Sequence, residues 1–325
     1  MPSWKTVQSK KQTAGKTKLA LFVLALILML LALAQLVKFS QILFSPWKLS
    51  VSNQKNFSWN SNFNINFLVH SKKISLILFS PKNGEINIIN IPDEVYLETA
   101  HGFGKWQLRS IFDFGQSQKG MGGDKLLKDS LSSFFGLPID GIVEGDLVNM
   151  ISKKQLSLLM MSNVKSDLTL FDLIRLQMEL SKVRFDKIKQ TDLGISDSLE
   201  KSTLADGTAV LLADPVRLDQ LFTNLADPIL SSEHRTIAIF NSTNYPQLAQ
   251  KAARLIANIG GDVIIVSNGK NKYQKTFISG EKSKTLDRLK QIFGSSDTID
   301  AGSEDLVLSR AQINLFLGED YYDRL

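Results

Sequence analysis

The sequence predicts a mixed α/β protein with one membrane-spanning N-terminal helix and two external domains. Three observations lead to this prediction. The chain of 325 residues begins with a basic tail, which is followed by one uninterrupted apolar run. The remainder alternates short strand-like segments with amphipathic helical ones, a pattern typical of α/β architecture. Ser231 and Ser232 lie between two such regions, and each region is long enough to form its own core.

The apolar run from Leu19 to Val37 predicts a transmembrane helix. It has 19 residues, and Gln35 is its only strongly polar side chain. At a rise of ~1.5 Å per residue it would span about 28 Å, close to the hydrocarbon thickness of a bilayer. Five lysines and no acidic residue precede the run, which predicts a cytoplasmic N-terminus and an extracytoplasmic remainder. A cleaved signal peptide is the alternative, because Ala32-Leu33-Ala34 resembles a cleavage site.

The positive net charge belongs to this N-terminal region. The formal charge is +6, and the six lysines among residues 1–38 account for all of it. Residues 39–325 hold 32 basic and 32 acidic side chains, so the external part is neutral. Membrane lipid is therefore an expected partner and nucleic acid is not. The chain has no cysteine, which excludes a disulfide scaffold and a thiolate metal site.

Five segments are expected along the chain. They are a basic tail at 1–18, the anchor at 19–37, a juxtamembrane stalk at 38–62, an α/β/α domain with a mixed sheet at 63–230, and a smaller α+β domain at 231–325. In the first domain, apolar runs predict strands at 63–69, 74–79, 86–91, 139–144, 183–190 and 208–212. Helical spacing there predicts helices at 124–135, 152–181 and 214–225. In the second domain, strands at 236–240, 262–266, 273–279 and 313–317 and helices at 245–259 and 283–293 predict a βαββαβ-like module.

A glycine-rich segment, residues 120–125, precedes one of the predicted helices. Backbone N–H groups at such a position could face a phosphate. However, Leu126 stands where a Walker sequence needs Ser or Thr to hold Mg²⁺. We therefore interpret Asp124 as an ordinary N-cap.

Residues 102–109 combine glycine, basic and aromatic side chains. Lys105 and Arg109 could neutralise a phosphate while Trp106 stacks on a sugar. The alternative is a solvated loop with one buried aromatic side chain. The three histidines lie far apart and show no metal-ligand spacing, and no G-x-S-x-G sequence is present.

Several segments in the order described carry a family resemblance. In the first domain they are 76–92, Gly104-Lys105, Gly122-Gly123 and 135–140. In the second domain they are 241–243, 248–249, 260–263, 275–278 and 317–320. Together these segments resemble the LytR-CpsA-Psr family of bacterial envelope proteins, and the second set resembles the LytR C-terminal domain. The resemblance implies a short cytoplasmic tail, one anchor helix and an external domain that moves an anionic glycopolymer from a polyprenyl-pyrophosphate carrier to peptidoglycan.

Two positions of the resemblance carry inverted charge. In the active family, carboxylates hold a divalent ion on the pyrophosphate, and an arginine in an I-P-R-D segment stabilises the leaving phosphate. Here the carboxylate position before the second strand falls on Lys72, and the arginine position falls on Asp93. A lost transition-state arginine costs about 10³-fold or more in rate. We therefore expect no catalytic residue, no bound metal and no cofactor.

The resulting hypothesis is a non-catalytic binding or scaffold protein of the cell envelope. Its expected partners are membrane lipid and a polyprenyl-linked glycopolymer, peptidoglycan or other envelope proteins. The alternative is a divergent glycopolymer phosphotransferase. In that case Lys72, Lys73, Lys105 and Arg109 would hold the pyrophosphate, and Glu94 would help to place Mg²⁺.

Overall fold

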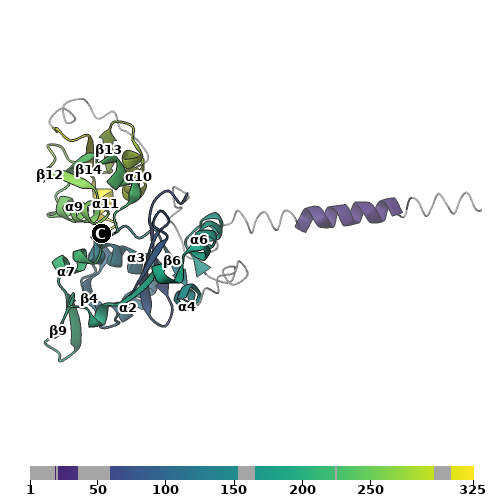
Figure 1. Ribbon diagram of the computed structural model, residues 1–325, viewed down its shortest axis with the longest axis horizontal. Coiled ribbons are helices and arrows are strands. Elements are labelled where there is room, and N and C mark those ends of the chain that lie inside the picture. Colours follow the sequence, from purple (N-terminus) through teal and green to yellow (C-terminus); the bar gives the residue numbers. More distant parts are fainter. Residues whose placement is uncertain (1–18, 20, 36–58, 153–164, 224, 296–308) are drawn as a thin grey trace, which may run out of the picture. The chain divides into compact units, whose positions relative to one another are not determined.

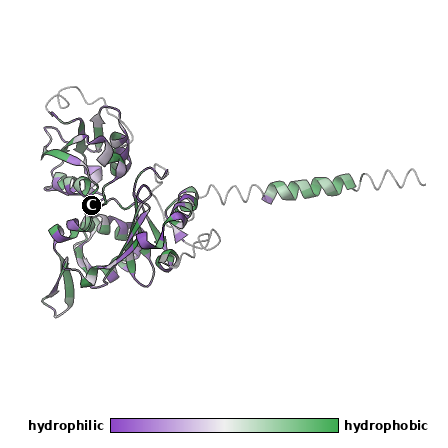
Figure 2. Ribbon diagram, in the orientation of Figure 1, coloured by the Kyte–Doolittle hydropathy of each residue, from purple (hydrophilic) through white to green (hydrophobic). Residues whose placement is uncertain are grey.

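The computed structural model describes residues 19, 21–35, 59–152, 165–223, 225–295 and 309–325 (Figure 1). They belong to two compact units, Met1–Lys48 and Leu49–Leu325. In the first unit, residues 19 and 21–35 are helical and almost uniformly hydrophobic (Figure 2). Within the described residues, no helix combines the length and the apolar character that crossing a membrane requires. The basic tail, the stalk up to residue 58, and positions 20, 36 and 37 of the predicted span lie outside the described residues.

The second unit contains a mixed sheet, as the sequence predicts. In the described residues its order is β7-β6-β1-β2-β3-β8. The strands are β1 (Ile65–His70), β2 (Ile74–Ser80), β3 (Glu85–Ile91), β6 (Gly141–Glu144), β7 (Lys165–Ser166) and β8 (Ile188–Asp192). Strands β1, β2 and β3 form an antiparallel meander, while β6 runs parallel to β1 and β8 runs parallel to β3.

Helices cover both faces of this sheet (Figure 1). Helices α2 (Leu108–Ser117) and α3 (Gly123–Phe135) pack on one face, against side chains that include Leu68 and Leu78. Helices α4 (Leu147–Ser152) and α6 (Leu170–Lys182) pack on the other face, against Phe67 and Phe79. Successive strand residues point to opposite faces, so all seven residues of β2 are buried. This explains why β2 is apolar in nearly every position.

Smaller elements surround these layers. They are β4 (Tyr96–Glu98), η1 (Ala100–Gly102), β5 (Lys105–Gln107), η2 (Phe185–Lys187), η3 (Leu193–Ile195), β9 (Leu199–Thr203), β10 (Ala209–Ala213), α7 (Pro215–Gln220) and α8 (Pro228–Glu233). Antiparallel pairs form between β4 and β5 and between β9 and β10. The proposed boundary at Ser231-Ser232 falls inside α8.

Three local expectations are wrong. The segment 102–109 is not a loop with a buried aromatic side chain, because β5 pairs with β4 and Trp106 is 39% exposed. The helix expected at 152–181 is not continuous, since β7 and a bend at 167–168 precede α6; its residues 153–164 lie outside the described residues. The strand expected at 183–190 begins only at Ile188, after the short helix η2.

The C-terminal domain has the predicted βαββαβ order. Its elements are β11 (Thr236–Asn241), α9 (Leu248–Asn258), β12 (Asp262–Asn268), β13 (Phe277–Gly280), α10 (Lys284–Phe293), β14 (Ile313–Leu317) and a terminal helix α11 (Glu319–Tyr322). The sheet order in the described residues is β12-β11-β14-β13. Strand β11 lies parallel to both neighbours, and β13 is antiparallel to β14.

A buried arginine joins this domain to the first one. Arg288 of α10 is 2% exposed, and its Nε lies 3.2 Å from a carboxylate oxygen of Asp227, the N-cap of α8. Its Nη1 lies 3.8 Å from Asp140, which follows α3, and its Nη2 donates to the carbonyl of Asn64 at 3.5 Å. The guanidinium also lies 3.9 Å from the centre of the Phe63 ring. Four residues of the first domain therefore surround one charged side chain of the C-terminal domain.

We expect Arg288→Met to destabilise the fold strongly. Methionine keeps much of the side-chain volume but leaves two buried carboxylates without their cation, a change that costs about 3 to 5 kcal/mol. Urea unfolding followed by circular dichroism measures the effect. Arg235→Met is the control, because Arg235 pairs with the 79%-exposed Glu281 and such surface pairs contribute less than about 1 kcal/mol. Equal shifts for the two variants would contradict the role given to Arg288.

Candidate functional site

An open pocket lies at the sheet edge where β1 and β6 end. It has a volume of about 360 Å³ and is lined by His70, Phe112, Glu144, Gly145 and Lys165. The rings of His70 and Phe112 lie 4.3 Å apart. Burial lowers the pKa of His70, against the opposing effects of Glu144 and Asp113. Because its ordinary pKa is already near 6.5, this imidazole is neutral at pH 7.

Asp124 contributes a second, more deeply placed carboxylate to this region. The prediction that Asp124 is the N-cap of α3 is wrong, because the N-cap is Gly122. Asp124 is the second residue of the helix. Among the described atoms its buried Oδ1 has no hydrogen-bond partner. Burial raises the pKa of Asp124 from 3.8 to about 6, and the charges of Glu144 and Asp167 add to this increase. The local environment therefore disfavours negative charge.

The glycines before Asp124 serve helix packing. Gly122 takes φ 80°, a left-handed conformation that other residues rarely adopt. A Cβ atom on Gly123 would lie 2.5 Å from the carbonyl oxygen of Phe112, and one on Gly115 would lie 2.9 Å from the Cα of Gly123. Helices α2 and α3 thus touch through their backbones at Gly115 and Gly123. This contact accounts for the glycine pair without a phosphate ligand.

The residues singled out from the sequence lie in different places. Lys72 and Lys73 are exposed in the turn between β1 and β2, and Glu94 is exposed in the turn after β3. Arg109 is exposed in the first turn of α2, where its backbone N–H donates to the carbonyl of Asp93 at 3.3 Å. Lys105 lies on β5 and lines a groove beside the C-terminal domain.

The donor set of the described residues does not fit a resident divalent metal. No group of three or more histidine and acidic side chains in this part of the chain could hold a metal ion. Asp124 and Glu144 influence each other electrostatically, but neither is joined by Glu94, which stays exposed. We therefore derive no chemical step through a metal.

A larger groove, of about 670 Å³, lies between the first domain and the C-terminal domain. The first domain contributes β4, β5, the end of α3, β10 and α7, and the C-terminal domain contributes α9, α10 and the last residues. Aromatic, hydroxyl and charged side chains all contribute to its lining. Examples are Tyr96, Lys105, Ser133, Phe134, Lys251 and Arg254. Its size and mixed lining are typical of ligand pockets.

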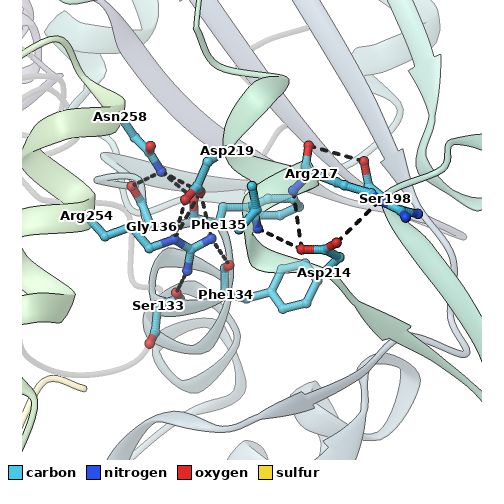
Figure 3. Close-up of polar contacts among 11 residues, drawn as sticks. Ser133, Phe134, Phe135, Gly136, Ser198, Asp214, Arg217, Asp219, Arg254 and Asn258 are labelled. Carbon is cyan, nitrogen blue, oxygen red and sulfur yellow. Dashed lines mark hydrogen bonds and ion pairs between the residues drawn. The ribbon is translucent and has the colours of Figure 1, made fainter.

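Arg254 of α9 lines this groove, and with Asn258 of the same helix it contacts the end of α3 (Figure 3). Arg254 binds Asp219 of α7 through Nε and Nη2, at 2.8 to 3.0 Å. It also donates to the carbonyls of Ser133 and Phe134 at 3.4 and 3.2 Å. Asn258 donates to the next two carbonyls, those of residues 135 and 136, at 3.2 Å. The C-terminal domain thus supplies the cation and the donors that the carbonyl end of α3 requires.

Most of the charged groups in the groove are already paired. Lys128 binds Asp167 at 2.5 Å, and Asp129 binds His101 at 3.0 Å. Lys105 and Lys251 are different, since neither has an ion-pair partner or a side-chain hydrogen bond within the described part of the chain. Glu98 is the cross-strand neighbour of Lys105, so the groove carries free charge of both signs. Lys251 was not singled out from the sequence, because nothing in its helical surroundings reveals the facing domain.

We expect Asp124→Asn to stabilise the protein at neutral pH. A carboxyl whose pKa is higher in the folded state binds its proton more tightly there, so stability falls as pH rises from about 4 to about 6. The full shift corresponds to about 3 kcal/mol, and solvent screening at this half-buried site reduces it to about 1 to 2 kcal/mol. Urea unfolding at pH 7.5 should show this gain, and the gain should shrink toward pH 4. The exposed Asp113→Asn is the control, and a pH-independent gain for Asp124→Asn would contradict the assignment.

Comparison with known proteins gives one family match and several solved structures. Residues 235–321 match the family described as LytR cell envelope-related transcriptional attenuator. TagT of Bacillus subtilis is similar, with 15% identity, a TM-score of 0.40, and coverage of 53% of this chain and 96% of that chain. The LytR-CPS2A-psr family protein YwtF (TagT) with bound octaprenyl pyrophosphate lipid is similar at 14% identity and a TM-score of 0.39, covering 53% and 95%.

A transcriptional regulator (EF0465) from Enterococcus faecalis is similar at 12% identity and a TM-score of 0.40, covering 63% of this chain and 92% of that chain. No curated protein matches the chain. The family match covers the segment in which the sequence resembles the LytR C-terminal domain. It confirms the predicted relationship to LytR-type envelope proteins: residues 235–321 form a LytR C-terminal domain.

Proposed function

We propose that this chain is a membrane-anchored, extracytoplasmic envelope protein that binds an envelope glycopolymer without transferring it. The LytR C-terminal domain supports an envelope role. The basic tail and apolar run support anchoring with the N-terminus in the cytoplasm. Two further features, the charge at the sheet edge and the packing beneath it, support binding without transfer.

The charge around Asp124 is the observation that carries this proposal. Burial is the main cause that raises the pKa of Asp124 to about 6, and the charges of Glu144 and Asp167 add to it against those of Lys128 and Lys165. A pyrophosphate beside Asp124 would likewise lose solvation and be repelled by these carboxylates. Lys165 is the cation beside Glu144, at 3.4 Å, but it is 69% exposed and therefore well screened by solvent. Phosphoryl transfer depends on positive charge held at the reacting phosphate. The sheet edge provides the opposite.

The apolar layer beneath this edge is filled by protein. Leu68 and Leu76 of the sheet and Leu127 and Leu131 of α3 are all 0% exposed. An isoprenoid tail needs apolar surface to bury against, and these side chains bury that surface against one another. This packing favours a protein that does not hold a polyprenyl carrier in this layer.

The groove lined by both domains suits a sugar polymer. Sugar rings have apolar faces and hydroxyl-bearing edges, which match the aromatic and polar side chains of the lining. Phe134 and Tyr96 supply aromatic surface, and Ser133 supplies a hydroxyl. Lys105 and Lys251 supply ammonium groups for an anionic substituent. YwtF (TagT), a protein similar to this chain, has octaprenyl pyrophosphate bound, so lipid-linked polymers are suitable probes.

The absence of transfer is tested with the full chain in detergent micelles. A polyprenyl-pyrophosphate-linked oligosaccharide and Mg²⁺ are supplied, and released polyprenyl phosphate is measured. We expect no release above that of a reaction without protein. Release that disappears in Lys105→Ala or Arg109→Ala would overturn the proposal in favour of a divergent phosphotransferase.

Binding is tested with the same oligosaccharide by isothermal titration calorimetry. Lys251→Ala should weaken binding about tenfold, because a charge-assisted hydrogen bond contributes about 1.5 kcal/mol or more. Lys201→Ala is the matched control, since Lys201 is an exposed lysine on β9 and does not line the groove. Equal affinity for both variants, or no binding by the unaltered protein, would contradict the groove as the binding site.

A further inference from the structure

Strand β12 is an apolar edge of the C-terminal sheet. It pairs with β11 on one side, and within the described residues no strand pairs with its other side. Ile264 and Val266 are 38% and 41% exposed. A register shift leaves Ile264 without a partner on β11, whereas Ile265–Asn268 pair regularly. Such an edge presents unpaired backbone N–H and C=O groups together with apolar side chains.

The edge strand β8 of the six-stranded sheet differs from β12 in its side chains. Strand β8 is an outer strand of that sheet and is exposed along nearly its whole length. It carries Lys189, Gln190, Thr191 and Asp192 in succession, and charged side chains on an edge discourage pairing with another chain. Between Val263 and Ser267, β12 has neither a charge nor a proline. Apart from the register shift at Ile264, which is a feature that can itself protect an edge, β12 therefore lacks the protection that β8 has.

The charges that flank β12 favour pairing with a second copy of itself. Asp262 begins the strand, and Lys270 follows its end; both are exposed, and neither has an ion-pair partner in the part of the chain that the structure describes. In an antiparallel pair of two β12 strands, the acidic end of each lies beside the basic end of the other. A parallel pair would place like charges together, which is unfavourable.

We propose that two copies of this chain associate through antiparallel pairing of their β12 edges. With the two-fold axis at Ile265, Ile264 of one copy lies opposite Val266 of the other, and Asp262 lies diagonally across from Lys270. The two exposed apolar side chains then cover each other, and the edge groups form hydrogen bonds between strands. The two four-stranded sheets become one continuous sheet with an isologous contact.

The association does not depend on whether the chain binds or transfers a polymer. It uses residues of β12 and its flanks, none of which lines the groove or the pocket at the sheet edge. If the groove variants did not change polymer binding, the proposed association through β12 would still stand. Conversely, a monomeric protein could still bind polymer, so the two proposals fail separately.

Cysteine cross-linking tests the register, because the natural chain has no cysteine. Full-length Ile264→Cys and Val266→Cys proteins, one with a size tag, are mixed in detergent micelles and oxidised. We expect the mixed dimer to exceed either self-linked dimer at least threefold. Thr191→Cys on the exposed edge β8 is the control and should cross-link weakly. Equal cross-linking at Thr191 and β12 would overturn the proposal.

Charge exchange tests the same contact without oxidation. Sedimentation of the full-length protein gives the dimer dissociation constant, which we expect to rise at least tenfold for Val266→Lys and at least threefold for Asp262→Lys. The double variant Asp262→Lys/Lys270→Asp should return to within threefold of the unaltered protein. All three changes are at exposed positions, and circular dichroism checks the fold. A monomer at all concentrations, or a dimer unaffected by Val266→Lys, would refute pairing through β12.

Discussion

The buried guanidinium of Arg288 is the contact on which the joining of the two external domains depends. The arginine belongs to α10, whereas its carboxylate partners Asp227 and Asp140 lie in the first domain. A charge this deeply buried is tolerated only while its partners remain in place, so separating the domains would leave three charged groups without their opposite charges. This coupling agrees with the compact unit formed by Leu49–Leu325. The LytR C-terminal domain is thus a structural part of its neighbour.

The LytR C-terminal domain also supplies hydrogen-bond donors to the end of α3, a helix of the first domain. The carbonyl end of α3 carries partial negative charge, and Arg254 and Asn258 of α9 supply its donors. Since Arg254 lines the groove, a ligand there would contact both domains at a surface they build together. The sheet edge, by contrast, belongs to the first domain alone and concentrates carboxylates. The groove and the sheet edge are therefore separate regions of the molecule with different charge.

The sequence predicts the layers of the fold better than its polar sites. The run 74–79 is apolar on both faces, a property typical of a strand in a sheet that is covered on both sides. Asp124 looks like an N-cap because capping is a local preference, whereas its raised pKa depends in part on the charges of Glu144 and Asp167, which are distant in sequence. Strand β5 has three residues, too few to show a period, so Trp106 could not be placed. Lys251 becomes a groove residue only through the packing of two domains.

The contact between α2 and α3 has a consequence for the space beneath them. At Gly115 and Gly123 the two helix backbones touch, because neither residue has a side chain to hold them apart. The leucines of α3 belong to the same buried cluster as the sheet residues beneath them. A single methyl group at either glycine would act as a spacer between the helices. Two residues without side chains therefore control how closely α2 and α3 pack above this layer.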